Sequence, residues 1–505
     1  MAIFTFMAAA LRFRNLDSQS MWSDELFSVQ MAMSGSWEEA MGISAVTGDL
    51  YGWFIYHYSS IFGNSDFALR STSAVAGVAL IPLIAETGRQ FHNENSGIIS
   101  AAILAVSFHA VRYSQEFRPY MLVTFILWTG ILLLHCRDRE RSRLTDLAII
   151  SLFVAAFIIH YFAALAVVVC LILYSARTIP ILTNILNKKG LSGYQALREY
   201  FSSNGVGILR ISLALLILAI FNLDSTISHG VGSDRVAWIP ETPEKPHLVL
   251  IGHFFADPWG DEDWRIKAEI VWIVVMISPL ALYLTRKQEK RPREWHDEPE
   301  WLLWLLSIGT LAFVVAYSSH VKQIFVVRYM TFFMPAWILL VGITLSRWIE
   351  LVKGEGGKIT EDWLGKLIAP ILSIVIFSSG IPGANIAIEH ENKTDFKGSS
   401  LWMEENIESN DAYIVSHGYP MYWNLYLERQ GSSLRVDDGV RVAPFPERVS
   451  DYIAENNPLT VVYLQSHTRE RPADSEFEES IWNSYDLVAE EEFFDARVRV
   501  FALRS

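Results

Sequence analysis

Long apolar runs follow one another through most of the chain and predict membrane-spanning helices. Each is long enough to cross, or nearly cross, a bilayer whose core takes about 20 helical residues. The runs occupy 67–86, 97–113, 119–136, 144–159, 161–176, 206–222, 268–285, 301–317, 324–345 and 364–381. None alternates as barrel strands do, and a helix is the other element that satisfies its own backbone hydrogen bonds in lipid. The sequence therefore predicts an all-helical membrane part.

A shorter apolar run at 1–11 is interpreted as a further span. Its basic residues, Arg12 and Arg14, follow the run, and no small-residue cleavage site appears, which argues against a signal peptide. With this run the chain has about eleven spans, although about eleven residues is short for a bilayer. The short length leaves open whether the chain is truncated at its N-terminus.

The distribution of positive charge predicts the orientation, because cytoplasmic loops retain Lys and Arg. With the N-terminus inside, the inner loops are about three times richer in Lys and Arg than the outer loops. These inner loops include 137–143, the segment with Lys188, Lys189 and Arg198, and 286–293. The outer side receives 12–66, the turn at Gln115 and Glu116, 223–267 and the link at His320. An odd number of spans also places the C-terminus outside.

Beyond residue 381 the pattern changes to short apolar stretches separated by helix-like segments. Strands are expected at 412–415, 434–436, 460–464 and 498–502. This alternation predicts a small α/β domain. The expected fold is thus an α-helical multi-pass membrane protein with a C-terminal extracytoplasmic α/β domain. Residues 1–384 would form the membrane domain, including the first outer loop 12–66, and residues 385–505 the second domain.

Composition agrees with this division. Of the 505 residues, 51% are hydrophobic and 19% charged, and the formal net charge is −14. Residues 385–505 carry about a dozen more acidic than basic residues, nearly the whole excess. An acidic protein repels a phosphate backbone, so no nucleic-acid partner is expected. The two cysteines, Cys136 and Cys170, lie in apolar runs, so no structural disulfide is expected.

The first outer loop contains two adjacent carboxylates, Asp24 and Glu25, soon after the first span. At the membrane surface a base can meet both a lipid-borne donor and a water-borne acceptor. Solvated loop acids are the commoner explanation for an isolated Asp-Glu pair. The rest of the sequence changes that balance.

The chain resembles the GT-C glycosyltransferases, especially the group of protein O-mannosyltransferases and the lipid A aminoarabinose transferase. The order and spacing of several segments carry the resemblance, and no single motif is specific. These segments are Trp22-Ser23-Asp24-Glu25, Phe62-Gly63-Asn64-Ser65-Asp66-Phe67-Ala68-Leu69-Arg70, Tyr113-Ser114-Gln115-Glu116-Phe117-Arg118-Pro119-Tyr120, His160-Tyr161-Phe162, Trp238-Ile239-Pro240, Arg328-Tyr329 with Pro335, and Asp395-Phe396-Lys397-Gly398.

The resemblance implies an inverting transfer of a sugar from a polyprenyl phosphate carrier to an extracytoplasmic acceptor. Asp24 would be the general base, with Glu25 completing the catalytic pair. The leaving phosphate needs a cation to hold its developing charge. The residues assigned to bind this phosphate are Arg328, Arg118 and Tyr329. Arg328 near a span end is a functional candidate by default, with snorkelling to the headgroups as the alternative. Arg118 has an alternative too, an ion pair with Glu116 that holds the turn.

Four further residues are accessory candidates: Glu116, Gln115, Asp49 and His160. Glu116 can orient an arginine, bind a cation or be solvated, and a lone histidine is more often structural than a ligand. Asp49 stands where related sequences often carry a His-Pro or similar polar group, which leaves its contact in doubt. The carboxylates on the outer side of the membrane leave open whether the protein binds a divalent cation. No cluster with the spacing of metal ligands is visible, so no metal site is assigned.

Two alternative functions remain. A transporter or flippase of a lipid-linked or polar solute would carry deep charges, interrupted helices or repeated halves. Here the spans are largely free of deep charge, and no internal repeat is evident. A surface scaffold would use the acidic tail to bind a partner. The sequence identifies neither the sugar nor the acceptor, which is a protein, a lipid or a glycan. The predicted location is the cell membrane.

Overall fold

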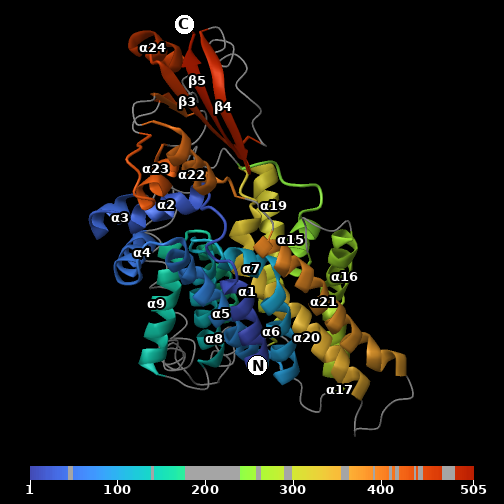
Figure 1. The fold of residues 1–505 in the computed structure, drawn as a ribbon. Helices are drawn as coiled ribbons and strands as arrows, with labels where there is room; N and C mark the ends of the chain where they lie inside the picture. Colours follow the sequence, from blue (N-terminus) through green and yellow to red (C-terminus); the bar gives the residue numbers. More distant parts are fainter. Residues whose placement is uncertain are drawn as a thin grey trace. The chain divides into compact units, whose positions relative to one another are not determined.

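The computed structural model describes residues 1–43, 49–137, 142–176, 239–256, 263–288, 298–353, 363–389, 393–408, 412–415, 420–436, 440–441, 447–468 and 484–504. The chain forms two compact units (Figure 1). The helical unit comprises Met1–Arg14 and Met31–Glu389, and the sheet unit comprises Asn15–Gln30 and His390–Ser505. The sequence assigned all of 12–66 to the membrane domain, whereas the structure groups Asn15–Gln30 with the C-terminal residues.

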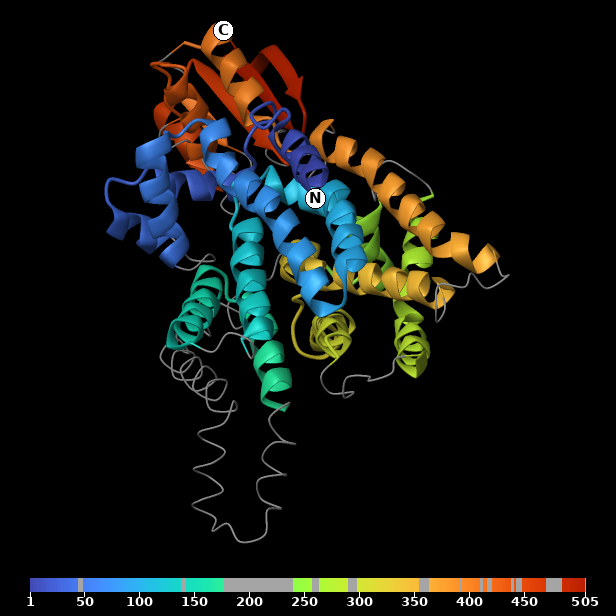
Figure 2. The ribbon, with the colours of Figure 1, turned by 90° about the horizontal axis from the view of Figure 1, so that it is seen from below.

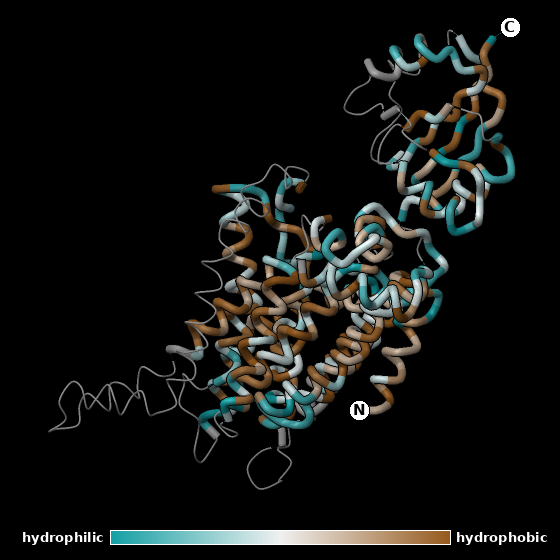
Figure 3. The backbone as a smooth tube through the Cα atoms, turned by 90° about the vertical axis from the view of Figure 1, so that its left-hand side faces the viewer, coloured by the Kyte–Doolittle hydropathy of each residue, from teal (hydrophilic) through white to brown (hydrophobic). Residues whose placement is uncertain are grey.

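Helices form the first unit, and their hydrophobic residues dominate it (Figure 3). They are α1 (Ala2–Phe13), α3 (Trp37–Ile43), α4 (Asp49–Phe62), α5 (Asp66–Phe91), α6 (Glu94–Val106), α7 (Phe108–Ser114), α8 (Tyr120–Cys136), α9 (Arg143–Ile159), α10 (Ala163–Ala176), α15 (Pro246–Phe255), α16 (Trp264–Met276), α17 (Ser278–Gln288), α18 (Glu300–Trp304), η3 (Leu305–Gly309), α19 (Thr310–His320), η4 (Val327–Phe333), α20 (Met334–Lys353) and α21 (Trp363–Glu389). Helix α2 (Ser23–Ala32) begins in the sheet unit and ends in the helical unit.

Every predicted apolar run within the described residues coincides with one or more of these helices. The described part has five helices long and apolar enough to span a membrane, and one bent pair that passes the same test together. The run at 206–222 and the predicted inner residues Lys188, Lys189 and Arg198 lie outside the described residues. The total of eleven spans therefore stays a prediction.

Two runs expected as single helices are interrupted. The run 97–113 bends by 59° between α6 and α7. Ser107 leaves helical geometry there, and its hydroxyl accepts from Ala110 N to cap α7. The run 324–345 begins outside any helix, is extended at Val326, and passes through the 3-10 helix η4 before α20. The short segments that follow these breaks, α7 and η4, carry polar residues such as His109 and Arg328.

Close helix packing holds this unit together. Helix α6 packs against both α5 and α20, and α5 and α6 lie side by side in Figure 2. A side chain at Gly97 would collide with the carbonyl oxygen of Ala85, and one at Gly342 with the hydroxyl of Ser100. In lipid the hydrophobic effect does not drive helices together. Small residues stabilise the association instead, because they let the two helix backbones pack closely.

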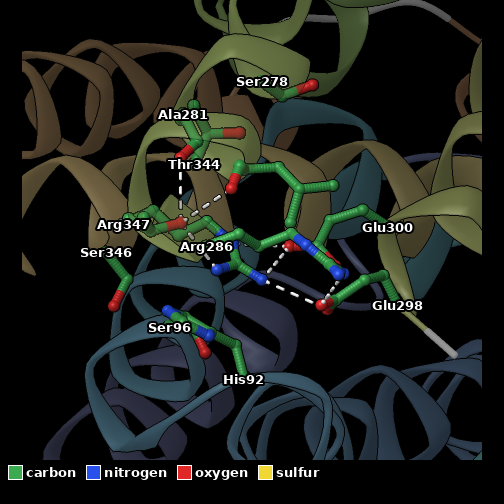
Figure 4. A network of polar contacts seen from close by, with 12 residues as sticks. His92, Ser96, Ser278, Ala281, Arg286, Glu298, Glu300, Thr344, Ser346 and Arg347 are labelled. Atoms are coloured by element: carbon green, nitrogen blue, oxygen red, sulfur yellow. Dashed lines mark hydrogen bonds and ion pairs between the residues drawn. The ribbon is translucent and has the colours of Figure 1, made fainter. Parts of the chain in front are cut away.

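A buried ionic network joins α17, α18 and α20 (Figure 4). Arg347 Nε donates to Glu300 at 2.6 Å, and its terminal nitrogens contact Thr285 at 2.9 Å and Glu298 at 3.4 Å. Arg286 also donates to Glu298, at 2.7 Å. The four charged side chains are at most 9% exposed. We call these residues the Arg347 network. Two arginines and two glutamates balance one another, which makes their burial tolerable.

The second unit is built on a five-stranded sheet of order β2-β1-β3-β5-β4. The strands are β1 (Ala412–Val415), β2 (Val440–Arg441), β3 (Thr460–Ser466), β4 (Tyr485–Phe493) and β5 (Ala496–Leu503). Strands β2, β1 and β3 are parallel, while β5 is antiparallel to β3 and β4. Helices α22 (Phe396–Asn406), α23 (Met421–Arg429) and α24 (Glu447–Asn456) accompany them.

Three of the expected strands are found as β1, β3 and β5, and one expectation is wrong. Residues 434–436 are not part of a strand, and the backbone N of Val436 instead bonds the Asn424 side chain at 2.7 Å. Strand β4 was not predicted. Its middle is exposed and carries Glu490, Glu491 and Glu492, so it lacks the apolar alternation that identifies a strand.

Candidate functional site

The two first-loop carboxylates stand in the first turn of α2 but in different environments. Acidic residues are favourable there because the helix N-terminus carries partial positive charge. Glu25 is fully buried, and its Oε2 accepts from Lys393 Nζ at 2.9 Å and from Trp22 N at 3.4 Å. Asp24 is partly exposed. The structure therefore separates the pair into a buried, ion-paired Glu25 and an accessible Asp24.

Arg328 and Tyr329 lie on the 3-10 helix η4, which several hydrogen bonds hold in place. The hydroxyl of Thr331 donates to the carbonyl oxygen of Arg328 at 2.5 Å and contacts Nε2 of the buried His109 at 2.8 Å. On the other side, Trp128 Nε1 donates to the carbonyl oxygen of Phe332 at 3.0 Å. The turn that presents Arg328 is thus fixed by α7 and α8.

Arg118, Tyr120, His160, Arg328 and Tyr329 gather from three separate parts of the helical unit. The Arg118 guanidinium lies 5.9 Å from the ring centre of Tyr120, and that of Arg328 lies 5.7 Å from the ring centre of Tyr329. The His160 ring is 5.7 Å from Tyr120 and 5.3 Å from Tyr329. We call these five residues the cationic cluster. Aromatic faces support a guanidinium without neutralising its charge.

His160 itself carries no charge at neutral pH. It forms the link between α9 and α10, and it is only 5% exposed, although the sequence placed it at the surface. Burial, followed by the charges of Arg118 and Arg328, lowers the pKa of His160 to about 3. Its Nδ1 accepts from Phe162 N at 3.3 Å, so the ring proton is assigned to Nε2. A neutral hydrogen-bond donor between two cations suits an anionic ligand.

The accessory residues in the turn after α7 have structural contacts. Gln115 Nε2 donates to the carbonyl oxygens of Arg14 at 2.7 Å and Leu11 at 3.3 Å, which ties the turn to α1. Glu116 is 1% exposed, and its Oε1 accepts from Arg112 at 3.4 Å. Arg112 thus forms an ion pair with Glu116 in this turn. These contacts position the chain that leads to Arg118.

Asp49 is the first residue of α4, and its side chain lies outside the described part, as does Trp238. Among the described residues, no three His, Cys, Asp or Glu side chains are grouped to hold a metal ion. The structure brings together Arg118, His160, Arg328 and Tyr329, and it places Asp24 and Glu25 in the sheet unit.

Sequence reasoning missed Tyr120, Thr331, His109 and Lys393. Tyr120 stood two residues after Arg118 in a quoted motif, so proximity could have suggested it. The other three act through partners far away in the sequence, which no local pattern reveals.

Comparison with known proteins supports the same interpretation of the fold. Residues 49–189 match the family described as dolichyl-phosphate-mannose-protein mannosyltransferase. No sequence among the curated proteins matches the chain. The structure is similar to ArnT from Cupriavidus metallidurans in the apo state, with a TM-score of 0.59, 13% identity, and 99% of this chain and 97% of that one covered.

Two further structures are similar. ArnT of the same organism bound to undecaprenyl phosphate gives a TM-score of 0.59 at 14% identity, over 99% of this chain and 97% of the other. The apo oligosaccharyltransferase of Archaeoglobus fulgidus gives 0.52 at 12% identity, over 93% of this chain and 69% of the other. The resemblance seen in the sequence is confirmed, and the structure is similar in fold to these proteins.

Proposed function

We infer that this chain is a membrane glycosyltransferase of the GT-C superfamily, and that it transfers a sugar from a polyprenyl phosphate carrier to an extracytoplasmic acceptor with inversion. The cationic cluster is the observation that carries this proposal. Arg118, Tyr120 and His160 are buried and Arg328 and Tyr329 are partly exposed. They lie together in a fold shared with a protein solved with undecaprenyl phosphate. A lipid-linked phosphate is the anion that such a site within a membrane protein would meet.

The cluster would hold the phosphate of the donor throughout the reaction. As the bond between the anomeric carbon and the phosphate oxygen breaks, its electron pair stays on that oxygen and the phosphodiester becomes a monoester. Arg118 and Arg328 offset the added negative charge, and preorganised donors of this kind act without reorganising during the step. Tyr329 and His160 Nε2 orient the group.

Asp24 would act on the acceptor. An acceptor hydroxyl is a poor nucleophile, and a partly exposed carboxylate can take its proton as the oxygen attacks the anomeric carbon. Attack opposite the departing phosphate inverts the configuration at that carbon. Buried and paired with Lys393, Glu25 does not take this proton.

The proposed arrangement in the membrane follows the charge distribution. About eleven spans would carry the chain across, with the C-terminal α/β domain extracytoplasmic. The proposed domain division is 1–384 and 385–505, and the acceptor would approach from the outer side.

Two variants test the assignment directly. Asp24→Asn should abolish turnover of a polyprenyl-phosphate sugar while leaving membrane insertion intact, because the amide cannot accept the proton. Purified protein would be incubated with a panel of lipid-linked sugars and the product identified by mass spectrometry. Asp17→Asn, an exposed carboxylate in the same segment, is the matched control and should retain activity. Normal turnover by Asp24→Asn would rule out the base.

Arg328→Ala should instead raise the donor KM, because it removes one of the two cations around the phosphate. Arg89→Ala removes an exposed arginine paired with Glu86 and serves as its control. If Arg328→Ala left both donor KM and kcat unchanged, the cluster would not be the donor site.

A further inference from the structure

The segment that carries Asp24 is held by the C-terminal residues of the sheet unit. We call Asn15–Gln30 the base segment. Its backbone and side chains bond α22, α23 and the chain just before α22, which are more than 360 residues away in the sequence. None of these C-terminal residues takes part in the proton transfer proposed for Asp24.

The strongest contact is the ion pair between Glu25 and Lys393. Lys393 Nζ lies 2.9 Å from Glu25 Oε2, and the two side chains are 8% and 0% exposed. A buried ion pair holds its two partners firmly because separating them leaves a charge without compensation. Asp24 is the adjacent residue in the same helical turn, so the position of Glu25 also fixes the backbone of Asp24.

Lys393 stands on a well-anchored piece of chain. The hydroxyl of the next residue, Thr394, donates to Asp495 Oδ2 at 2.7 Å. Asp395 N donates to the carbonyl oxygen of Phe494 at 2.9 Å, and its carboxylate caps α22 through Gly398 N at 2.8 Å. Phe494 and Asp495 form the turn between β4 and β5. The sheet therefore supplies the rigid support.

A second set of bonds holds the base segment just before α2. The backbone N of Met21 donates to the Tyr426 hydroxyl at 2.7 Å, and Met21 is fully buried. The hydroxyl of Ser20 accepts from Lys397 N at 3.1 Å. Past these bonds, the Phe27 ring meets Tyr422 edge-on at 6.3 Å. The segment is thus fixed on both sides of Asp24.

We propose that the C-terminal residues are a positioning element for the base, in which Lys393 acts through Glu25, and Tyr426 through the backbone of Met21, to set the place of Asp24. The proposal rests on the proposed function, since it assumes that Asp24 is the base. Lys393 and Tyr426 are positioning residues and do not take part in proton transfer. Catalytic groups must be held to within a fraction of an ångström, and a displacement of about 1 Å can lower a rate about 100-fold.

The test compares kcat and donor KM in full-length protein. Lys393→Met should lower kcat about 10- to 100-fold, as expected for a displaced base. The donor KM should stay within about twofold, because the cationic cluster is unchanged. A protein that is merely destabilised would lose kcat only in proportion to its folded fraction, so kcat is calculated per folded molecule. Arg504→Met is the control: it removes an exposed cation of the same unit, which pairs with Asp486 and makes none of the contacts described for the base segment. It should retain kcat within about twofold.

A double variant identifies the ion pair as the cause. If Glu25 and Lys393 act as one unit, Glu25→Gln/Lys393→Met should be no slower than Lys393→Met alone, because coupled residues are not additive. It also removes both buried charges, so it keeps the test available if Lys393→Met fails to fold. Losses that add would overturn the proposed pairing.

The outcome also separates this inference from the proposed function. Unchanged kcat in Lys393→Met, alongside inactive Asp24→Asn, would overturn the positioning role and leave the base in place. Full activity in Asp24→Asn would overturn the proposed function itself.

Discussion

The helical unit contains two groups of arginines, one buried and one partly exposed, and the neighbours described for them differ. In the Arg347 network the guanidiniums meet carboxylates at 2.6 to 3.4 Å. In the cationic cluster, Arg118 and Arg328 lie against tyrosine rings, and both lower the pKa of the histidine between them. The first group is electrically balanced, whereas the potential that the two arginines create at His160 is positive.

This difference distinguishes a structural role from a binding role. A balanced buried network stabilises the fold only while every partner is present, and it has no net charge to offer a ligand. A cluster of cations on aromatic rings favours an incoming anion. Substitutions in the first group should therefore affect unfolding, and substitutions in the second should affect donor binding.

The largest effect is expected from Arg347→Met. This change leaves Glu298 and Glu300 buried without the cation that contacts both, and such losses cost about 3–5 kcal/mol. Thermal unfolding of the purified protein should show a marked fall in Tm, while donor KM of the folded protein is unchanged. Arg89→Met, which removes the exposed partner of Glu86, should cost less than about 1 kcal/mol. Equal destabilisation by both variants would remove the distinction between the network and a surface pair.

A smaller and different effect is expected from Arg118→Gln. Loss of one charge-assisted hydrogen bond to the donor phosphate is worth about 1.5–3 kcal/mol, or about 10- to 100-fold in donor affinity. Titration with a polyprenyl phosphate would measure the affinity, and Tm should change little. If Arg118→Gln unfolded the protein as Arg347→Met does, the cluster would be structural.

The third effect concerns His160 and develops gradually with pH. Because burial lowers its pKa to about 3, the unfolded chain binds a proton between about pH 6.5 and pH 3 that the folded protein does not. Stability should therefore fall as pH decreases through this range, by up to about 1.4 kcal/mol per unit. His160→Phe should reduce this dependence, as measured by Tm at pH 7 and pH 5. An identical pH dependence in the variant would contradict the buried, neutral histidine.

Sequence patterns predicted features that depend on neighbouring residues. The apolar runs predicted the helices, and ordered motifs drew attention to Arg118, His160 and Arg328 before any geometry was known. What the sequence missed depends on distant partners. Ser107 breaks a run that hydropathy reads as continuous, and the 3-10 turn at Arg328 depends on Thr331, His109 and Trp128. The role of Glu25 likewise depends on Lys393, a residue that no spacing rule connects to it.

The 368 positions between Glu25 and Lys393 have a consequence for biosynthesis. A chain made from its N-terminus would insert nearly all its helices before Lys393 left the ribosome. The proposed base, Asp24, would then be positioned only by the last quarter of the polypeptide. Nascent or prematurely terminated chains would be inactive in the membrane. The enzyme would become active only after the C-terminal residues had been translated.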